Sequence, residues 1–201
     1  MIKTLEEKGY GEDMEKPPVM YHGTHKKEEG ITELEPRGGR HRGRDEGKVL
    51  FATPDRVMAS MFLAKGHNDN RTKIGKYNGT PVMVINEDRN EFIETDKGGT
   101  IHELPSDTFS CDKGTGLGEL EWTSTKKVQP TGKTEYDSSL DAMIENGVQV
   151  FFVDAKTFED IKSDKENHGV GILKDLESEN QLTDKNFSPF WENWKYRQKK
   201  G

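Results

Sequence analysis

The hydrophobic residues of this chain gather into short runs that are separated by long polar stretches. Short runs that are apolar throughout, or that alternate apolar and polar positions, are typical of β-strands. The runs that fit this description lie at 19–22, 49–53, 80–86, 90–96, 100–105, 120–130 and 148–154. Their close succession between residues 80 and 130 predicts a β-meander.

Helical spacing of apolar residues occurs in segments between and after these strands. The helices that this spacing predicts span 54–65, 138–147, 155–164 and 171–182. Pro54 suits the first position of the first helix, and Asp154 suits the N-cap of the third. The strand at 148–154 is too apolar to stand exposed, so we expect it to join a sheet that the flanking helices cover.

Polar segments with few apolar anchors are typical of loops and chain termini. They predict a flexible N-terminal arm at 1–18, loops at 24–48, 66–79 and 110–119, and a polar tail at 183–201. The first loop contains the glycine-rich stretch PRGGRHRGR, and we expect it to be mobile or to become ordered on binding.

Composition narrows the class of protein. Of the 201 residues, 30% are hydrophobic and 33% are charged, and the formal net charge is −7. This acidic balance argues against a protein that mainly coats nucleic acid, although a local basic patch is compatible with it. The single cysteine, Cys111, excludes an intrachain disulfide framework, and without a CxxC pair there is no thiolate zinc site.

The sequence also bears on membranes and metals. No apolar run approaches the roughly 20 residues of a membrane span, and residues 1–18 lack the apolar core of a signal peptide. We therefore expect a cytoplasmic protein that does not enter a membrane. The six histidines include no pair at the spacing of a metal site on a helix, so we predict no metal ion. His102, in the alternating run at 100–105, is compatible with solvent exposure.

Four motifs follow one another along the chain: YHGT at 21–24, LFATPD with its helix at 50–65, GGTIHELP at 98–105 and ELEWTS at 119–124. In this order and spacing they resemble the ADP-ribosyltransferase fold, in which two small β-sheets grip NAD. The likeness is to the histidine-first branch, which includes diphtheria-toxin-like enzymes and poly-ADP-ribose polymerases. It covers residues 19–130 and implies an α+β fold with a split β-sheet core, flanking helices and a C-terminal helix-strand-helix extension.

The resemblance implies which residues hold NAD. His22 is expected to hydrogen-bond the hydroxyls of the adenosine-side ribose, and the backbone of Gly23 to pair with the nicotinamide carboxamide. Glycine suits that role because the amide then approaches the main chain directly. Phe62 is the candidate ring for stacking on the nicotinamide. The full set of expected NAD contacts is Tyr21, His22, Gly23, Thr24, Arg40, Arg42, Phe51, Ala52 and Phe62.

The resemblance also assigns catalytic roles to His22 and Glu121. Glu121 is expected to accept a hydrogen bond from the 2′-hydroxyl of the nicotinamide ribose. A carboxylate aimed there stabilises the positive charge that develops as the glycosidic bond breaks, and this chemistry needs neither a metal nor a covalent nucleophile. Glu119 would share one side of a strand with Glu121, so it is the reserve and the candidate for positioning the acceptor. Leu50 stands where this branch commonly has tyrosine, so the stacking face is supplied elsewhere or is lost.

The glycine-rich stretch at 37–44 carries four arginines, whose forks match phosphate oxygens. Three interpretations of it stay open. It clamps the pyrophosphate of NAD, it guides a nucleic-acid or nucleotide acceptor, or it is a solvated loop without a ligand.

We predict one domain at 19–182, with a core at 19–130 and an extension at 136–182. The leading hypothesis is an NAD-dependent mono-ADP-ribosyltransferase that releases nicotinamide, in a phage or bacterial modification or toxin setting. Its acceptor would be a protein, a nucleic acid or a small molecule. The alternatives are an RNA 2′-phosphotransferase on a related fold, a non-catalytic nucleotide or nucleic-acid binding module, and an inhibitor or interaction protein.

Overall fold

The fold is known from a computed structural model of the chain. It describes residues 16–25, 31–41, 44–64, 71–77, 79–111, 118–166, 169–179 and 187–188. At 38–41, 44–46, 118 and 187–188 it describes the backbone alone. Most of the predicted arm and of the predicted tail lies outside these ranges.

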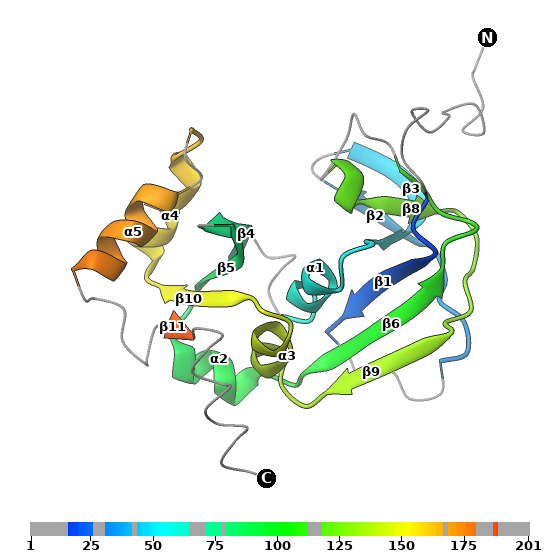
Figure 1. Ribbon diagram of the computed structural model, residues 1–201, viewed down its shortest axis with the longest axis horizontal. Coiled ribbons are helices and arrows are strands. Elements are labelled where there is room, and N and C mark those ends of the chain that lie inside the picture. Colours follow the sequence, from blue (N-terminus) through cyan, green and yellow to red (C-terminus); the bar gives the residue numbers. More distant parts are fainter. Residues whose placement is uncertain are drawn as a thin grey trace. The chain divides into compact units, whose positions relative to one another are not determined.

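Within the described residues the protein is α+β, as the sequence predicts, with three small sheets and five α-helices (Figure 1). The chain divides into two compact units, which we describe separately. Unit 1 comprises residues 1–23, 28–59 and 101–134, and unit 2 comprises residues 24–27, 60–100 and 135–201.

Unit 1 is built on two sheets. The first orders its strands β1 (Val19–Thr24), β6 (Gly99–Pro105) and β9 (Gly132–Tyr136). The second orders its antiparallel strands β2 (Arg37–His41), β3 (Arg44–Ala52), β8 (Trp122–Ser124) and β7 (Ser110–Cys111). An antiparallel bridge between Tyr21 and Thr53 joins β1 to the residue that follows β3. The core cluster draws on both sheets and contains Met20, Leu34, Leu50, Ala52, Leu104, Phe109, Trp122 and Val128.

Unit 2 contains the third sheet. Its strand order is β11 (Phe187–Ser188), β10 (Gln149–Val153), β5 (Thr80–Asn86) and β4 (Thr72–Tyr77). β10 runs parallel to β5, and the two outer strands are antiparallel to their neighbours. The helices α4 (Ala155–Ser163) and α5 (Val170–Ser178) pack into a core cluster with this sheet. The predicted strand at 148–154 therefore joins a sheet that helices cover, as expected.

Two helices of unit 2 begin where their capping residues predict. Helix α3 (Ser139–Glu145) is preceded by Ser138, whose hydroxyl accepts a hydrogen bond from the backbone N of Asp141. Helix α4 is preceded by Asp154, whose carboxylate accepts one from the backbone N of Thr157 at 2.7 Å. Such caps pair the free N–H groups of the first turn, so a short polar side chain fixes the helix start.

The carboxylate of Asp96 fastens the start of α3 from a distant position in the sequence. One of its oxygens accepts hydrogen bonds from the Ser138 hydroxyl at 3.0 Å and from the backbone N of Ser139 at 2.7 Å and of Leu140 at 3.2 Å. The other oxygen accepts one from the backbone N of Gly98 at 3.0 Å. Asp96 therefore ties the approach to β6 to α3 within unit 2.

Within the glycine-rich stretch at 36–44, the described residues 37–41 and 44 lie in strands rather than in a loop. β2 and β3 pair antiparallel, with Arg37 opposite Val49 and Arg40 opposite Asp45, and the register shifts between Gly38 and Arg40. The loop prediction was wrong because backbone hydrogen bonds alone can hold such a pair. Glycine and charged residues give no apolar alternation that would reveal it in the sequence.

The predicted strand at 90–96 is also wrong. Helix α2 (Arg89–Thr95) occupies this segment and interrupts the predicted meander. Its N-cap is Asp88, whose carboxylate accepts a hydrogen bond from the backbone N of Asn90 at 2.8 Å. Phe92 is the one buried side chain of α2, so the segment has no alternating buried face to pack as a strand.

The predicted helix at 54–65 is shorter than expected. Helix α1 (Arg56–Met61) starts two residues after Pro54, because the carboxylate of Asp55 accepts a hydrogen bond from the backbone N of Val57 at 2.8 Å. Asp55 thus takes the capping position, and proline precedes the helix instead of opening it.

Further differences concern strands that the sequence did not predict and one strand that is shorter than predicted. The predicted loop at 66–79 contains the edge strand β4, whose residues are mostly polar and partly exposed. The predicted strand at 120–130 pairs as β8 over three residues only, and Val128 forms a bridge with Leu34 instead. β9 has no apolar alternation, and the sequence did not predict it.

Candidate functional site

Backbone pairing in unit 1 places three of the motif segments side by side. Tyr21 donates its N–H to the carbonyl of Thr53 at 2.7 Å, and Thr53 donates back to the Tyr21 carbonyl at 2.9 Å. On the other side of β3, Ala52 lies opposite Trp122 of β8. Glu121 directly precedes Trp122, at the end of this pairing.

The imidazole of His22 is held by the neighbouring strand. Its Nδ1 lies 2.7 Å from the backbone carbonyl of Phe51 on β3. A carbonyl oxygen only accepts hydrogen bonds, so Nδ1 carries the proton and donates it. In the neutral ring Nε2 is then left as an acceptor, which suits a ligand hydroxyl.

Burial keeps this imidazole neutral. The pKa of His22 is lowered from 6.5 to about 4, and the largest cause is the loss of solvation on burial. Electrostatic interactions with His102 and Arg37 also lower it. The hydrogen bond to the Phe51 carbonyl opposes these effects and raises the pKa. Because the lowering wins, His22 is neutral at pH 7, with Nε2 as a hydrogen-bond acceptor.

His102 of β6 is the neighbour of this imidazole. The ring centroids of His22 and His102 lie 6.4 Å apart, at an interplanar angle of 31°. His102 is only 1% exposed, so it is buried, although its place in the sequence was compatible with solvent exposure. A second titratable ring beside His22 was therefore hidden from the sequence, because alternation in β6 does not say which face is buried.

The other expected NAD contacts take varied positions. Tyr21, Gly23 and Thr24 follow along β1 and are partly buried, and Phe51 on β3 is partly buried as well. Ala52 is 7% exposed and belongs to the core cluster, close behind the Tyr21–Thr53 bridge. Phe62 lies in the turn after α1, in unit 2, and is partly buried.

Glu119 and Glu121 do not share one side of a strand, so that prediction was wrong. Glu119 lies in the 3-10 helix η3 (Gly118–Leu120) and is exposed, whereas Glu121 lies between η3 and β8 and is partly buried. The fully buried indole of Trp122 donates its Nε1 hydrogen to the Glu119 carbonyl at 2.9 Å. This bond fixes the turn from Glu119 to Trp122, so Glu121 lies between a residue whose carbonyl is hydrogen-bonded and a residue whose side chain is buried.

Leu50 belongs to the core cluster of unit 1 and is 5% exposed. Its side chain packs with Met20 and Trp122 in the cluster and therefore offers no face to a ligand. The nicotinamide ring, where the resemblance expects a tyrosine, would have to stack on another side chain.

The arginines expected to clamp pyrophosphate are described only in part. Arg40 lies in β2, where the structure describes its backbone, and Arg42 lies outside the described residues. Arg37, at the start of β2, is exposed, and it is close enough to lower the pKa of His22.

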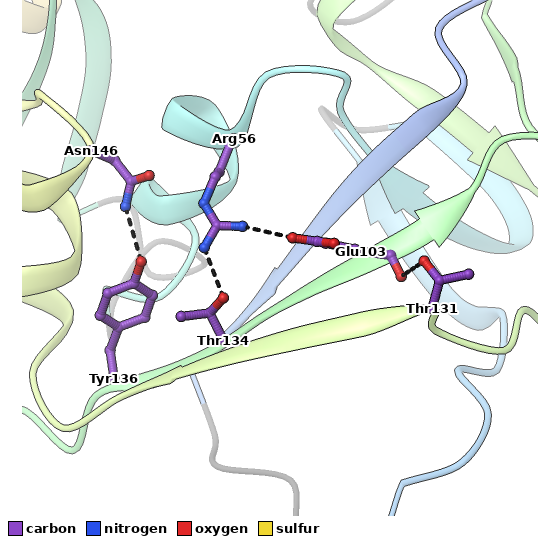
Figure 2. Close-up of polar contacts among 6 residues, drawn as sticks. All are labelled: Arg56, Glu103, Thr131, Thr134, Tyr136 and Asn146. Atoms are coloured by element: carbon purple, nitrogen blue, oxygen red, sulfur yellow. Dashed lines mark hydrogen bonds and ion pairs between the residues drawn. The ribbon is translucent and has the colours of Figure 1, made fainter.

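A polar cluster on α1, β1, β6 and β9 was missed by the sequence (Figure 2). The Arg56 guanidinium donates to the Glu103 carboxylate at 3.2 Å and to the Thr134 hydroxyl at 2.8 Å. It also lies over the Tyr21 ring, 5.7 Å from the centroid. The partners stand 47 and 78 residues away along the chain, and no local signal could have joined them.

Among the described residues, no group of three or more His, Cys, Asp or Glu side chains is placed to hold a metal ion. In the same part of the chain, no helix is both long and apolar enough to cross a membrane. A scan against models of protein families and searches of curated proteins and of solved structures found no match for this chain.

Proposed function

We propose that the protein is an NAD-dependent mono-ADP-ribosyltransferase whose site lies in unit 1. The observation that carries this proposal is the strand pairing that joins Tyr21 to Thr53 and Ala52 to Trp122, the residue after Glu121. It supports the proposal because the three motifs that resemble the histidine-first branch would otherwise be scattered over one hundred residues. Two small sheets joined at the Tyr21–Thr53 bridge agree with the split sheet that the resemblance implies.

The state of His22 supports the same proposal. A neutral ring with Nδ1–H donated to the Phe51 carbonyl presents Nε2 as an acceptor. The ribose hydroxyls of NAD are donors of the matching kind. The backbone of Gly23, the next residue of β1, would pair with the nicotinamide carboxamide.

The transfer requires one bond to break and one to form. The bond between the ribose C1′ and the nicotinamide nitrogen breaks, and its electron pair leaves with nicotinamide, which becomes neutral. The acceptor nucleophile, or water, bonds to C1′ and releases its proton. Glu121 would hold the 2′-hydroxyl and stabilise the positive charge on the ribose between these events.

The two glutamates provide a matched test. The protein is incubated with labelled NAD and a cell lysate, and both nicotinamide release and transfer of label are measured. We expect Glu121→Gln to lower the rate by about 100-fold or more, as for loss of one charge-stabilising group. Glu119→Gln should keep the rate of nicotinamide release within about threefold of the wild type, since Glu119 is expected to act on the acceptor and not on the ribose. Absence of NAD binding and of label in every fraction would refute the proposal.

Position 50 favours one second candidate, a nucleotide-binding module without catalysis. With Leu50 buried in the core, the ring that the resemblance expects beneath the nicotinamide is missing from that strand position. Calorimetry with NAD, ADP-ribose and short RNA separates the two candidates. Tight binding of NAD or ADP-ribose without nicotinamide release would favour the module over the transferase.

A further inference from the structure

The Arg56 guanidinium joins four elements of unit 1. It starts from the first turn of α1, donates to Glu103 on β6 and Thr134 on β9, and lies over Tyr21 of β1. Figure 2 shows the side chain reaching between its two hydrogen-bond partners, with the three strands running beneath it. The planar fork of arginine makes these contacts at once, which a lysine ammonium on a single point cannot do.

Two of these contacts are on residues adjacent to the histidine pair. Tyr21 precedes His22 on β1, and Glu103 follows His102 on β6. Successive side chains of a strand point to opposite faces, so His22 and His102 lie on one face and Tyr21 and Glu103 on the other. The histidines share their face with core-cluster residues two positions away on each strand. Arg56 therefore holds the same two backbones from the reverse side.

Glu103 is itself held by the residue that precedes β9. Its carbonyl accepts hydrogen bonds from the backbone N of Thr131 at 2.8 Å and from the Thr131 hydroxyl at 3.3 Å (Figure 2). A Cβ at Gly132 would lie 3.0 Å from a carboxylate oxygen of Glu103, so glycine leaves the space that this carboxylate occupies. The Glu103 backbone therefore has partners of its own, and its carboxylate has room to meet Arg56.

We propose that Arg56 is a positioning residue for His22, which rests on the proposed role of His22 in binding NAD. By fixing Tyr21 and Glu103, Arg56 sets the spacing of β1 and β6 and so the direction of the His22 Nε2 acceptor. Its own contribution to folding is small, because the Arg56 and Glu103 side chains are 29% and 41% exposed and such pairs contribute little to stability. Loss of Arg56 should therefore change ligand binding more than folding.

The first measurement is of nicotinamide release from NAD with water as the acceptor. Arg56→Gln should raise KM about tenfold and change kcat less than about threefold, because a misdirected ribose contact weakens ground and transition states alike. Arg56→Lys should resemble Arg56→Gln, since it keeps the charge and loses the fork. Lys127→Gln, which removes another exposed ion pair of unit 1, with Glu33 and Glu35, is the control and should resemble the wild type.

The second measurement asks whether Arg56 acts through His22. In a His22→Asn background, Arg56→Gln should add less than about a twofold rise in KM, because the group it positions is already gone.

The outcomes separate the two proposals. If the wild type neither binds NAD nor releases nicotinamide, the proposed function fails, and the role of Arg56 in NAD binding fails with it. If the wild type releases nicotinamide and Arg56→Gln has an unchanged KM, the role of Arg56 alone is overturned. Full additivity of the two substitutions, or a KM change in Arg56→Gln that Lys127→Gln reproduces, would also overturn it.

Discussion

The burial of His22 makes the stability of the protein depend on pH. In the folded protein the pKa is about 4, and in the unfolded chain it is about 6.5. Between these two values the unfolded state binds a proton that the folded state does not. The contribution of His22 to stability is therefore present in full above pH 6.5 and is lost as the pH falls toward 4.

The size of this effect follows from the two pKa values. Linkage with one group gives a loss of about 2 kcal/mol in the free energy of unfolding between pH 7.5 and pH 5. We expect urea denaturation to show this loss in the wild type beyond the loss seen in His22→Asn. Asparagine keeps a donor for the Phe51 carbonyl and does not titrate in this range. His25→Asn, which replaces an exposed histidine, should keep the pH dependence of the wild type.

If the wild type and His22→Asn lose the same stability between pH 7.5 and 5, then His22 does not have a lowered pKa in the folded protein. In that case the neutral ring and its Nε2 acceptor would no longer support a ligand contact at this position.

Two further predictions concern unit 2. Asp96→Ala removes the acceptor of four hydrogen bonds, three of them at the start of α3. It should lower the free energy of unfolding by about 2–4 kcal/mol, measured by urea denaturation. An effect below about 0.5 kcal/mol would contradict this role of Asp96. Gly99→Ala places a Cβ 2.1 Å from the backbone carbonyl oxygen of Thr24 and should cost about 1–3 kcal/mol in the same assay. Gly75→Ala, where a Cβ meets nothing within 4 Å, is its control, and equal effects at the two glycines would refute the steric argument.

The sequence predicted the parts of the fold that depend on local signals. Ser138 and Asp154 cap helices because a short polar side chain meets the first free N–H groups whatever the rest of the chain does. The strand β10 was also predictable, because a short run that is apolar at every position fits a strand buried on both faces of a sheet. The strand prediction for segment 90–96 was wrong because Asp88, which lies just before the apolar run, caps a helix there.

The remaining features depend on partners far away in the sequence. The strands β2 and β3 are held together by backbone pairing at mostly polar and glycine positions, so no apolar pattern in the sequence predicts them. The YHGT motif pointed to His22, yet nothing in it revealed that His102 would lie beside the ring. The contacts of Arg56 with Glu103 and Thr134 arise only once two strands, β6 and β9, and α1 have come together.

The proposed NAD site is formed by β1 and the start of β8. It can be tested by titrating the isotope-labelled protein with NAD and following by NMR the backbone amides of Gly23 and Glu121 and the indole of Trp122. We expect all three signals to shift together and to yield one dissociation constant. Signals that do not shift at saturating NAD, or that shift at Gly23 alone, would contradict it.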